Sequence, residues 1–184
     1  GTTLSHVPSA PYLHADPAAV ARWRARLPGF RVGLVWAGAP RAEDSAALAT
    51  DRRRSLPLAA LAPLGAISGV RLVSLQKGDA AGQPVPAGMV LHDWTAELGD
   101  FDDTAALVAA LDLVISVDTA PVHLAGGLGV PTWMLNRYDC CWRWLCDRDD
   151  SPWYPRLRQF RQDAPGAWPG VVARVADALR EVAA

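Results

Sequence analysis

The sequence predicts a doubly wound α/β fold, in which helices cover both faces of a parallel sheet. Short apolar runs that stop at glycine or a polar residue are typical of strands buried in such a sheet, and the clearest are residues 31–38, 70–75, 111–117 and 131–135. Segments with helical spacing lie between these runs and after them. This alternation favours a parallel sheet, because each helix returns the chain to the edge where the next strand begins.

The remaining elements follow in chain order. The first 30 residues are expected to form an extended, proline-rich lead-in and a short helix, which begins behind an Asp16 cap with Pro17 in its first turn. Residues 31–184 are expected to form the sheet domain. Further helices are predicted at residues 57–67, where Pro63 interrupts the pattern, and at 103–111, 120–129 and 168–183, with weaker strand patterns at 89–93 and 157–161.

Composition excludes several classes of partner. The chain has 184 residues, and its formal net charge of -1 offers no basic surface for nucleic acid or an anionic membrane. The most apolar stretch, Leu107 to Val117, contains Asp112 and is far shorter than the roughly 18 residues of a spanning helix. We therefore expect no nucleic-acid partner and no transmembrane segment.

The three cysteines are crowded into one segment, at Cys140, Cys141 and Cys146, without the paired CxxC spacing of a zinc site. They are expected to be free thiols of a cytoplasmic protein, and no metal ion is expected.

Several enzyme classes lack their motifs here. The first strand leads through GLVWAGAP, so the G-x-G-x-x-G fingerprint of dinucleotide dehydrogenases is missing, and the chain has neither a P-loop nor a G-x-S-x-G nucleophile elbow. A metal-dependent phosphoacceptor domain would need acidic residues where this sequence has Trp36 and Gly38.

A ligand is expected at the carboxyl ends of the strands, where open α/β sheets bind their substrates. Gln76 and Lys77 follow the strand at 70–75, and Lys77 is the single lysine among 18 basic residues. A compact ammonium can act as a point charge against phosphate oxygens, although lysine in a loop is more often simply solvated.

The segment SVDTAPVHLAGGLGVP (116–131) carries a second ligand signal. Asp118 and Thr119 end a strand and can cap the next helix, with Pro121 in its first turn and His123 one turn in. The amino terminus of such a helix suits a phosphate group. The alternative is that Asp118 and Thr119 only cap the helix and that His123 is a core residue.

Two further clusters have two interpretations each. DRRRSLP (51–57) could bring Arg54 and Ser55 to the ligand edge, or it could be an exposed charged loop. The aromatic residues of segment 140–155 could stack on a base or a sugar, or they could pack the C-terminal region. They are Trp142, Trp144, Trp153 and Tyr154.

Five segments carry a family resemblance through their order and spacing. They are VGLVWAG (32–38), RRRSLPLAALAPL (52–64), VSLQKG (73–78), DFDDTAALVAALDLVISVDTAPVHLAGGLGVPTW (100–133) and WRWLCDRDDSPWYPRLRQFRQ (142–162). Together they resemble the C-terminal, donor-binding domain of bacterial glycosyltransferase family 9 proteins, which include the lipopolysaccharide heptosyltransferases. The most similar members are those attached to tetratricopeptide repeats.

The resemblance implies the C-terminal half of a GT-B glycosyltransferase, in which two Rossmann-like domains face each other across a cleft. Residues 31–184 would be a Rossmann-like nucleotide-sugar-binding domain. Transfer in this family is expected to be inverting and independent of a metal, so no cofactor is expected beside the nucleotide-diphosphate sugar that is the donor substrate. The implied partners are an N-terminal acceptor domain and, in such relatives, tetratricopeptide repeats.

The resemblance also implies which residues bind the donor. They are Lys77, Asp118, Thr119, Ala120 and His123, with Arg54 and Ser55 at the same edge. A ribose contact from Glu97 or Asp102 is left open. The general base is expected in the acceptor half, so we predict that this chain acts as a glycosyltransferase only within a longer protein and binds the donor without turning it over alone. The alternative is a non-catalytic nucleotide or nucleotide-sugar binding module.

Overall fold

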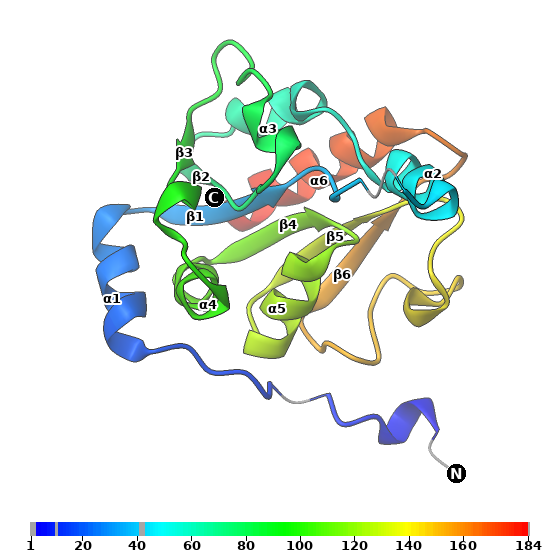
Figure 1. Cartoon of the computed structure of the whole chain (residues 1–184), viewed down its shortest axis with the longest axis horizontal. Coiled ribbons are helices and arrows are strands. Elements are labelled where there is room, and N and C mark those ends of the chain that lie inside the picture. The colour runs from blue at the N-terminus through cyan, green and yellow to red at the C-terminus, as the bar shows by residue number, and fades with distance from the viewer. Residues whose placement is uncertain (1–2, 10, 41–42, 184) are drawn as a thin grey trace.

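The computed structural model describes residues 3–9, 11–40 and 43–183, so residues 1, 2 and 10 of the expected lead-in lie outside it. Six strands form one sheet, in the order β3-β2-β1-β4-β5-β6, and all neighbours are parallel (Figure 1). This is the doubly wound order, and the predicted fold class is confirmed. The strands are β1 Phe30–Val35, β2 Val70–Ser74, β3 Leu91–Asp93, β4 Leu113–Val117, β5 Thr132–Asn136 and β6 Leu157–Arg161.

The helices fall between the strands as the alternating pattern indicated. The α-helices are α1 Pro17–Arg26, α2 Ser45–Arg54, α3 Ala62–Gly65, α4 Phe101–Ala109, α5 Ala120–Leu128 and α6 Trp168–Ala183. Short 3-10 helices are η1 Leu4–His6, η2 Leu58–Leu61, η3 Asp79–Gly82, η4 Thr95–Glu97 and η5 Trp142–Trp144. No helix in the described part of the chain is long and apolar enough to cross a membrane.

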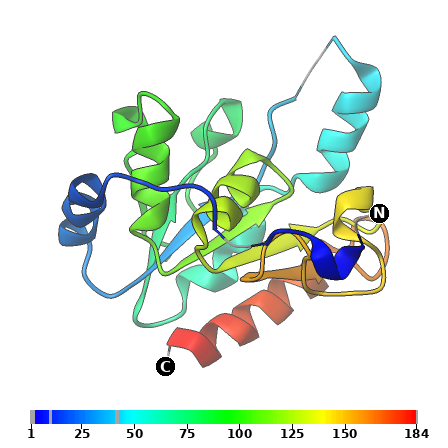
Figure 2. The ribbon, with the colours of Figure 1, turned by 90° about the horizontal axis from the view of Figure 1, so that it is seen from below.

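Two apolar layers cover the two faces of the sheet. One layer, which includes Leu34 and Ile115, packs against η2, α3 and α6, and the other, which includes Val73 and Val114, packs against α1, α4 and α5. Figure 2 shows α6 on one side of the sheet and α4 and α5 on the other. Strands that are buried on both faces read as continuous apolar runs, which explains the strength of the strand signals.

Helix α2 was not among the predicted helices, and the arginines of segment 51–57 were expected either at the ligand edge or in an exposed charged loop. The side chain of Asp44 caps this helix by accepting hydrogen bonds from the main-chain N–H groups of Ala46 and Ala47, at 3.0 and 2.9 Å. Alanine favours the following turn. The arginines then occupy the last turn, where positive charge interacts well with the helix dipole.

The helix predicted at residues 57–67 is instead two short pieces, η2 and α3. Pro63 falls in the first turn of α3, where proline is tolerated, so a new helix begins there and the first does not continue through it.

Candidate functional site

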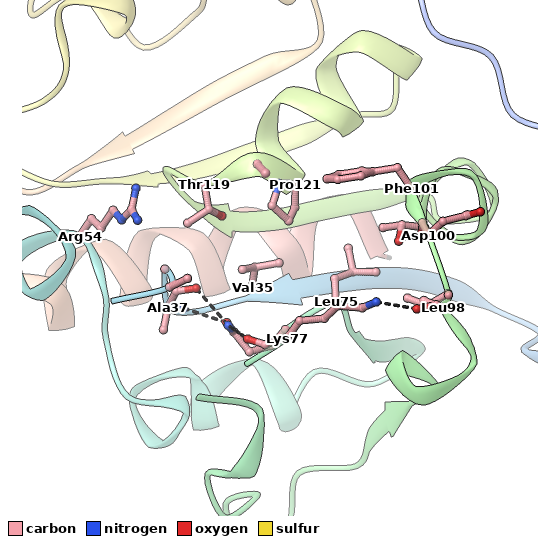
Figure 3. A pocket seen from close by; sticks show the side chains of 16 residues that line it. Val35, Ala37, Arg54, Leu75, Lys77, Leu98, Asp100, Phe101, Thr119 and Pro121 are labelled. Carbon is pink, nitrogen blue, oxygen red and sulfur yellow. Dashed lines mark hydrogen bonds between the residues drawn. The ribbon is translucent and has the colours of Figure 1, made fainter. Parts of the chain in front are cut away.

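A pocket of about 590 Å³ opens at the carboxyl edge of the sheet (Figure 3). Its walls come from the segments that follow β1, β2, η4 and β4, together with Arg54 from the end of α2. Strand β1 has β2 on one side and β4 on the other, so the pocket lies where the chain reverses its direction of winding. Ligands of doubly wound folds bind at this switch point.

The buried side chain of Gln76 fixes the floor of the pocket. Its amide oxygen accepts hydrogen bonds from the main-chain N–H groups of Trp36 and Ala37, at 3.0 and 2.9 Å. Its amide nitrogen donates to the carbonyl oxygens of Ala37 and Lys77. The Gln76 side chain thus replaces the main-chain hydrogen bonds between β1 and β2 at the point where the two strands separate. Sequence reasoning placed Gln76 at a strand exit but did not find this role.

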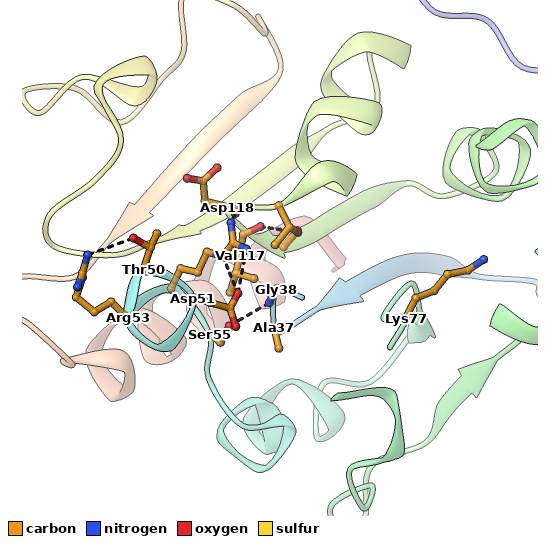
Figure 4. A network of polar contacts seen from close by, with 12 residues as sticks. Ala37, Gly38, Thr50, Asp51, Arg53, Ser55, Lys77, Val117 and Asp118 are labelled. Carbon is orange, nitrogen blue, oxygen red and sulfur yellow. Dashed lines mark hydrogen bonds and ion pairs between the residues drawn. The ribbon is translucent and has the colours of Figure 1, made fainter. Parts of the chain in front are cut away.

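Arg54 and Ser55 meet the exit of β1 through a polar network (Figure 4). The Arg54 guanidinium donates to the buried carboxylate of Asp51, at 2.9 and 3.0 Å, and to the main-chain oxygen of Asp118 at 2.9 Å. The Ser55 hydroxyl accepts from the N–H of Gly38 at 3.0 Å. A side chain at Gly38 would overlap the Asp51 carboxylate and the Arg54 guanidinium, so any larger residue here would displace this ion pair.

The amino terminus of α5 faces this pocket through Thr119, Ala120 and Pro121. No side chain caps the helix, contrary to the expectation for Asp118 and Thr119, because the Thr119 hydroxyl donates instead to the main-chain oxygen of Val117 at 3.1 Å. The first turn therefore presents main-chain N–H groups and the positive end of the helix dipole to a ligand. This arrangement favours a phosphate group.

Lys77 lines the same pocket, but its ammonium lies away from the α5 terminus. It donates a 2.6 Å hydrogen bond to the main-chain oxygen of Leu98, which holds the side chain across Leu75 (Figure 3). Among the described residues, no carboxylate forms a salt bridge with this ammonium. The lysine therefore contributes an unpaired positive charge to the pocket.

The other end of the pocket is largely apolar. Leu75, Leu98 and Phe101 line it, and the Phe101 side chain is 69% exposed although it points across the pocket toward Pro121 (Figure 3). Asp100 also lies here, and its carboxylate caps α4 by accepting from the N–H of Asp103 at 2.9 Å. Sequence reasoning missed Asp100 and Phe101, because no motif distinguishes them from an ordinary helix start.

Two expected donor contacts lie elsewhere. Asp118 contributes its main-chain oxygen to Arg54, but its side chain points away from the Gly38 network and is not part of the pocket wall (Figure 4). His123 lines a second pocket on the other side of α5. Its Nδ1 lies 2.9 Å from the Tyr154 hydroxyl, and its ring stacks on the buried Trp144. Burial lowers the pKa of His123, with Asp118 opposing and Arg143 assisting the shift.

The two candidates for the ribose are also outside the first pocket. Glu97 forms an ion pair with Arg26, at 2.6 and 2.8 Å, and that guanidinium lies over the rings of both Trp23 and Trp94. Asp102 does not line the pocket, and Asp100 is the one carboxylate that does so among the described residues. Within residues 3–9, 11–40 and 43–183, no three His, Cys, Asp or Glu side chains gather as a metal site.

The fold of the chain is the Rossmann-like parallel sheet that GT-B glycosyltransferases share. It is similar to the solved structure of Escherichia coli ADP-heptose LPS heptosyltransferase II, with a TM-score of 0.62 and 16% identity, over 94% of this chain and 53% of that chain. It is also similar to the glycosyl transferase family 9 structure from Veillonella parvula, with a TM-score of 0.62 and 12% identity, over 95% of this chain and 54% of that one.

Among curated proteins, the chain is similar to Protein FlbA of Caulobacter vibrioides, with 38% identity over 184 residues. The match covers 94% of this chain and 29% of FlbA. No family model matches the chain. The chain thus spans about half the length of the two solved structures and under a third of FlbA.

Proposed function

We propose that this chain is the C-terminal, donor-binding half of an inverting glycosyltransferase, and that its first pocket holds a nucleotide-diphosphate sugar. The observation that carries the proposal is the pocket at the switch point of the sheet, because the uncapped start of α5, Arg54 and Lys77 all line it. A diphosphate needs this combination of main-chain donors and positive charge.

The shape of the pocket suggests how the donor lies in it. The diphosphate would lie across Thr119 and Ala120, within reach of Arg54. The nucleoside would then extend toward Leu98 and Phe101, where an aromatic face can stack on a base. The Lys77 ammonium is held at the apolar end by the Leu98 oxygen, and it would contact the diphosphate only after it leaves that oxygen.

The described residues that line the pocket include no free general base. Its carboxylate, Asp100, is engaged in capping α4, and His123 lies in the other pocket. We therefore propose that an acceptor domain elsewhere in a longer protein supplies the base, as in two-domain glycosyltransferases. The share of the solved structures that the chain covers supports this, because it matches about half of each. Tetratricopeptide repeats remain a proposed partner on the sequence resemblance alone.

Calorimetric titration tests the donor site. UDP, ADP and GDP are titrated separately into the chain, with and without a chelator, and one of them is expected to bind equally well in both conditions. Phe101→Ala should weaken this binding roughly tenfold if the base stacks on the ring. Absence of binding by all three at millimolar concentration would refute the proposal.

An activity assay on the longer protein distinguishes the proposed transferase from the alternative, a non-catalytic binding module. When the reading frame around this chain is expressed whole, release of nucleoside diphosphate from a sugar donor in the presence of acceptor supports the transferase. Nucleotide binding without any turnover supports the binding module.

A further inference from the structure

The second pocket, which we call the aromatic pocket, has a different character from the first. Its volume is about 300 Å³, and it lies between α5, the N-terminal segment and the loops around η5. The N-terminal segment is held there because the N–H groups of Tyr12 and Leu13 both donate to the main-chain oxygen of Gly127, at 3.0 Å (Figure 2). The walls are Tyr12, His123, Trp142, Arg143, Trp153 and Tyr154, with Pro8 at the edge.

The structure beneath these side chains holds them in place. The Tyr154 hydroxyl is 2.9 Å from His123, whose ring stacks on the fully buried Trp144 with ring centroids 5.3 Å apart. The indole N–H of Trp153 donates to the main-chain oxygen of Arg143 at 2.8 Å, which joins the two loops that carry the tryptophans. The side chains of His123, Trp153 and Tyr154 therefore lose little entropy when a ligand binds.

Two side chains at the mouth, those of Trp142 and Arg143, are exposed to solvent. The Trp142 side chain is 72% exposed. The guanidinium of Arg143 lies over its ring at 5.3 Å, and among the described residues it has no salt bridge to a carboxylate. An exposed indole beside an unpaired cation is a surface that gains from a bound ligand.

Size and charge limit what this ligand can be. Ligand pockets span roughly 300–1,000 Å³, so this one is at the small end and suits a single ring. A diphosphate would find one cation here and no helix terminus, and the first pocket offers both. Aromatic faces with polar tips match a sugar, whose C–H groups pack on the rings while its hydroxyls meet the Tyr, His and Arg hydrogen-bonding groups.

We propose that the aromatic pocket binds one pyranose ring, with Trp142 as its stacking surface and Arg143 as a hydrogen-bond donor. The pocket lies on the opposite side of the α5 start from the nucleotide, since Pro121 lines the first pocket and His123 the second. That the ring belongs to a glycosyl donor or acceptor rests on the proposed function. The binding of a free sugar does not.

Ligand-observed NMR saturation transfer on the chain tests this proposal with glucose, N-acetylglucosamine and glucuronic acid as probes. At least one sugar should bind saturably at millimolar concentration. Trp142→Ala should weaken the binding of this sugar roughly tenfold, and Trp142→Phe should retain most of the affinity.

The matched control is Phe101→Ala, which removes a similarly exposed ring from the first pocket. It should leave sugar binding unchanged, while Trp142→Ala leaves nucleotide binding unchanged. Both positions are exposed, and circular dichroism checks that each variant folds.

The outcomes separate the two proposals. Nucleotide binding without any sugar binding, or sugar binding that Trp142→Ala does not alter, overturns the aromatic pocket alone. Sugar binding without nucleotide binding overturns the donor site alone. A nucleoside without phosphate, such as uridine or adenosine, is the third probe. If Trp142→Ala eliminates nucleoside binding and Phe101→Ala leaves it intact, then a base occupies the aromatic pocket and the sugar assignment is wrong. A competition experiment distinguishes a donor sugar from an acceptor sugar. If the aromatic pocket holds the sugar of the donor, an added nucleotide-diphosphate sugar should displace the free monosaccharide from it, and if the pocket holds an acceptor sugar, it should not.

Discussion

The ammonium of Lys77 donates a 2.6 Å hydrogen bond to the main-chain oxygen of Leu98, across the mouth of the pocket at the switch point of the sheet. This contact joins the exit of β2 to the segment before α4. It also keeps the single lysine of the chain at the apolar end of the pocket and away from the start of α5. A phosphate must therefore compete with a carbonyl oxygen for this cation.

Replacement of Lys77 measures that competition. Lys77→Ala should weaken nucleoside diphosphate binding by about tenfold, because a charge-assisted contact is lost. Lys77→Arg should restore only part of the affinity, since a planar guanidinium cannot take the place of a compact ammonium beside Leu98. Titration calorimetry of the three proteins checks this. If both variants bind as tightly as the parent chain, the lysine has no part in the site.

Gly38 is predicted to be essential for the shape of the β1 exit. Gly38→Ala places a methyl group against the Asp51–Arg54 pair, so the pair must separate, and the free energy of unfolding should fall by about 3 kcal/mol. Urea denaturation measures the loss. The matched control is Gly82→Ala, where a new Cβ meets nothing within 4 Å and should change stability by less than about 0.5 kcal/mol. Equal effects of the two substitutions would contradict this account.

The environment of His123 predicts how stability depends on pH. Burial lowers the pKa of the folded His123 below its ordinary value, so the unfolded chain takes up this proton first as the pH falls. The stabilisation from the neutral ring is therefore complete above the unfolded pKa of about 6.5, and it is lost as the pH falls through the folded pKa. The difference in the free energy of unfolding between the parent chain and the His123→Gln variant should therefore be larger at pH 7.5 than at pH 5. NMR titration of the ring should give a midpoint below the ordinary value, and a midpoint at or above it would reject the prediction.

The thiols of Cys140 and Cys146 are close enough to form a disulfide. Their sulfur atoms are 3.8 Å apart, and the segment between them carries Trp142 and Arg143 of the aromatic pocket. With glutathione disulfide as oxidant, the two thiols should form one S–S bond while the oxidant is reduced to two thiols. The reaction should be slow at neutral pH, because burial raises the pKa of the Cys140 thiol.

Peptide mapping by mass spectrometry identifies this bond. Cys146→Ser should prevent it and Cys141→Ser should not, because the Cys141 sulfur faces the Arg143 guanidinium. A bond that joins Cys141 to either neighbour would contradict the geometry.

Much of the candidate site followed from chain-local signals. The family resemblance added Arg54 and Ala120 to the expected site. A strand that ends at a glycine or a polar residue marks a position on the carboxyl edge, and this argument placed Lys77 and Thr119 in what the structure shows to be the same pocket. It could not separate His123 from them. Whether a helical residue faces one side of α5 or the other depends on the packing of Tyr154 and Trp144, which are distant in sequence.

Local sequence patterns predict the parallel α/β class, because strands buried on both faces and helices with one apolar side leave strong local signals. The order of the strands, the uncapped start of α5 and the division of the expected site between two pockets became visible only in the folded chain. The reason is physical. Periodicity reports which side of an element is buried, whereas a pocket depends on which distant side chains meet there, and those contacts exist only once the chain has folded.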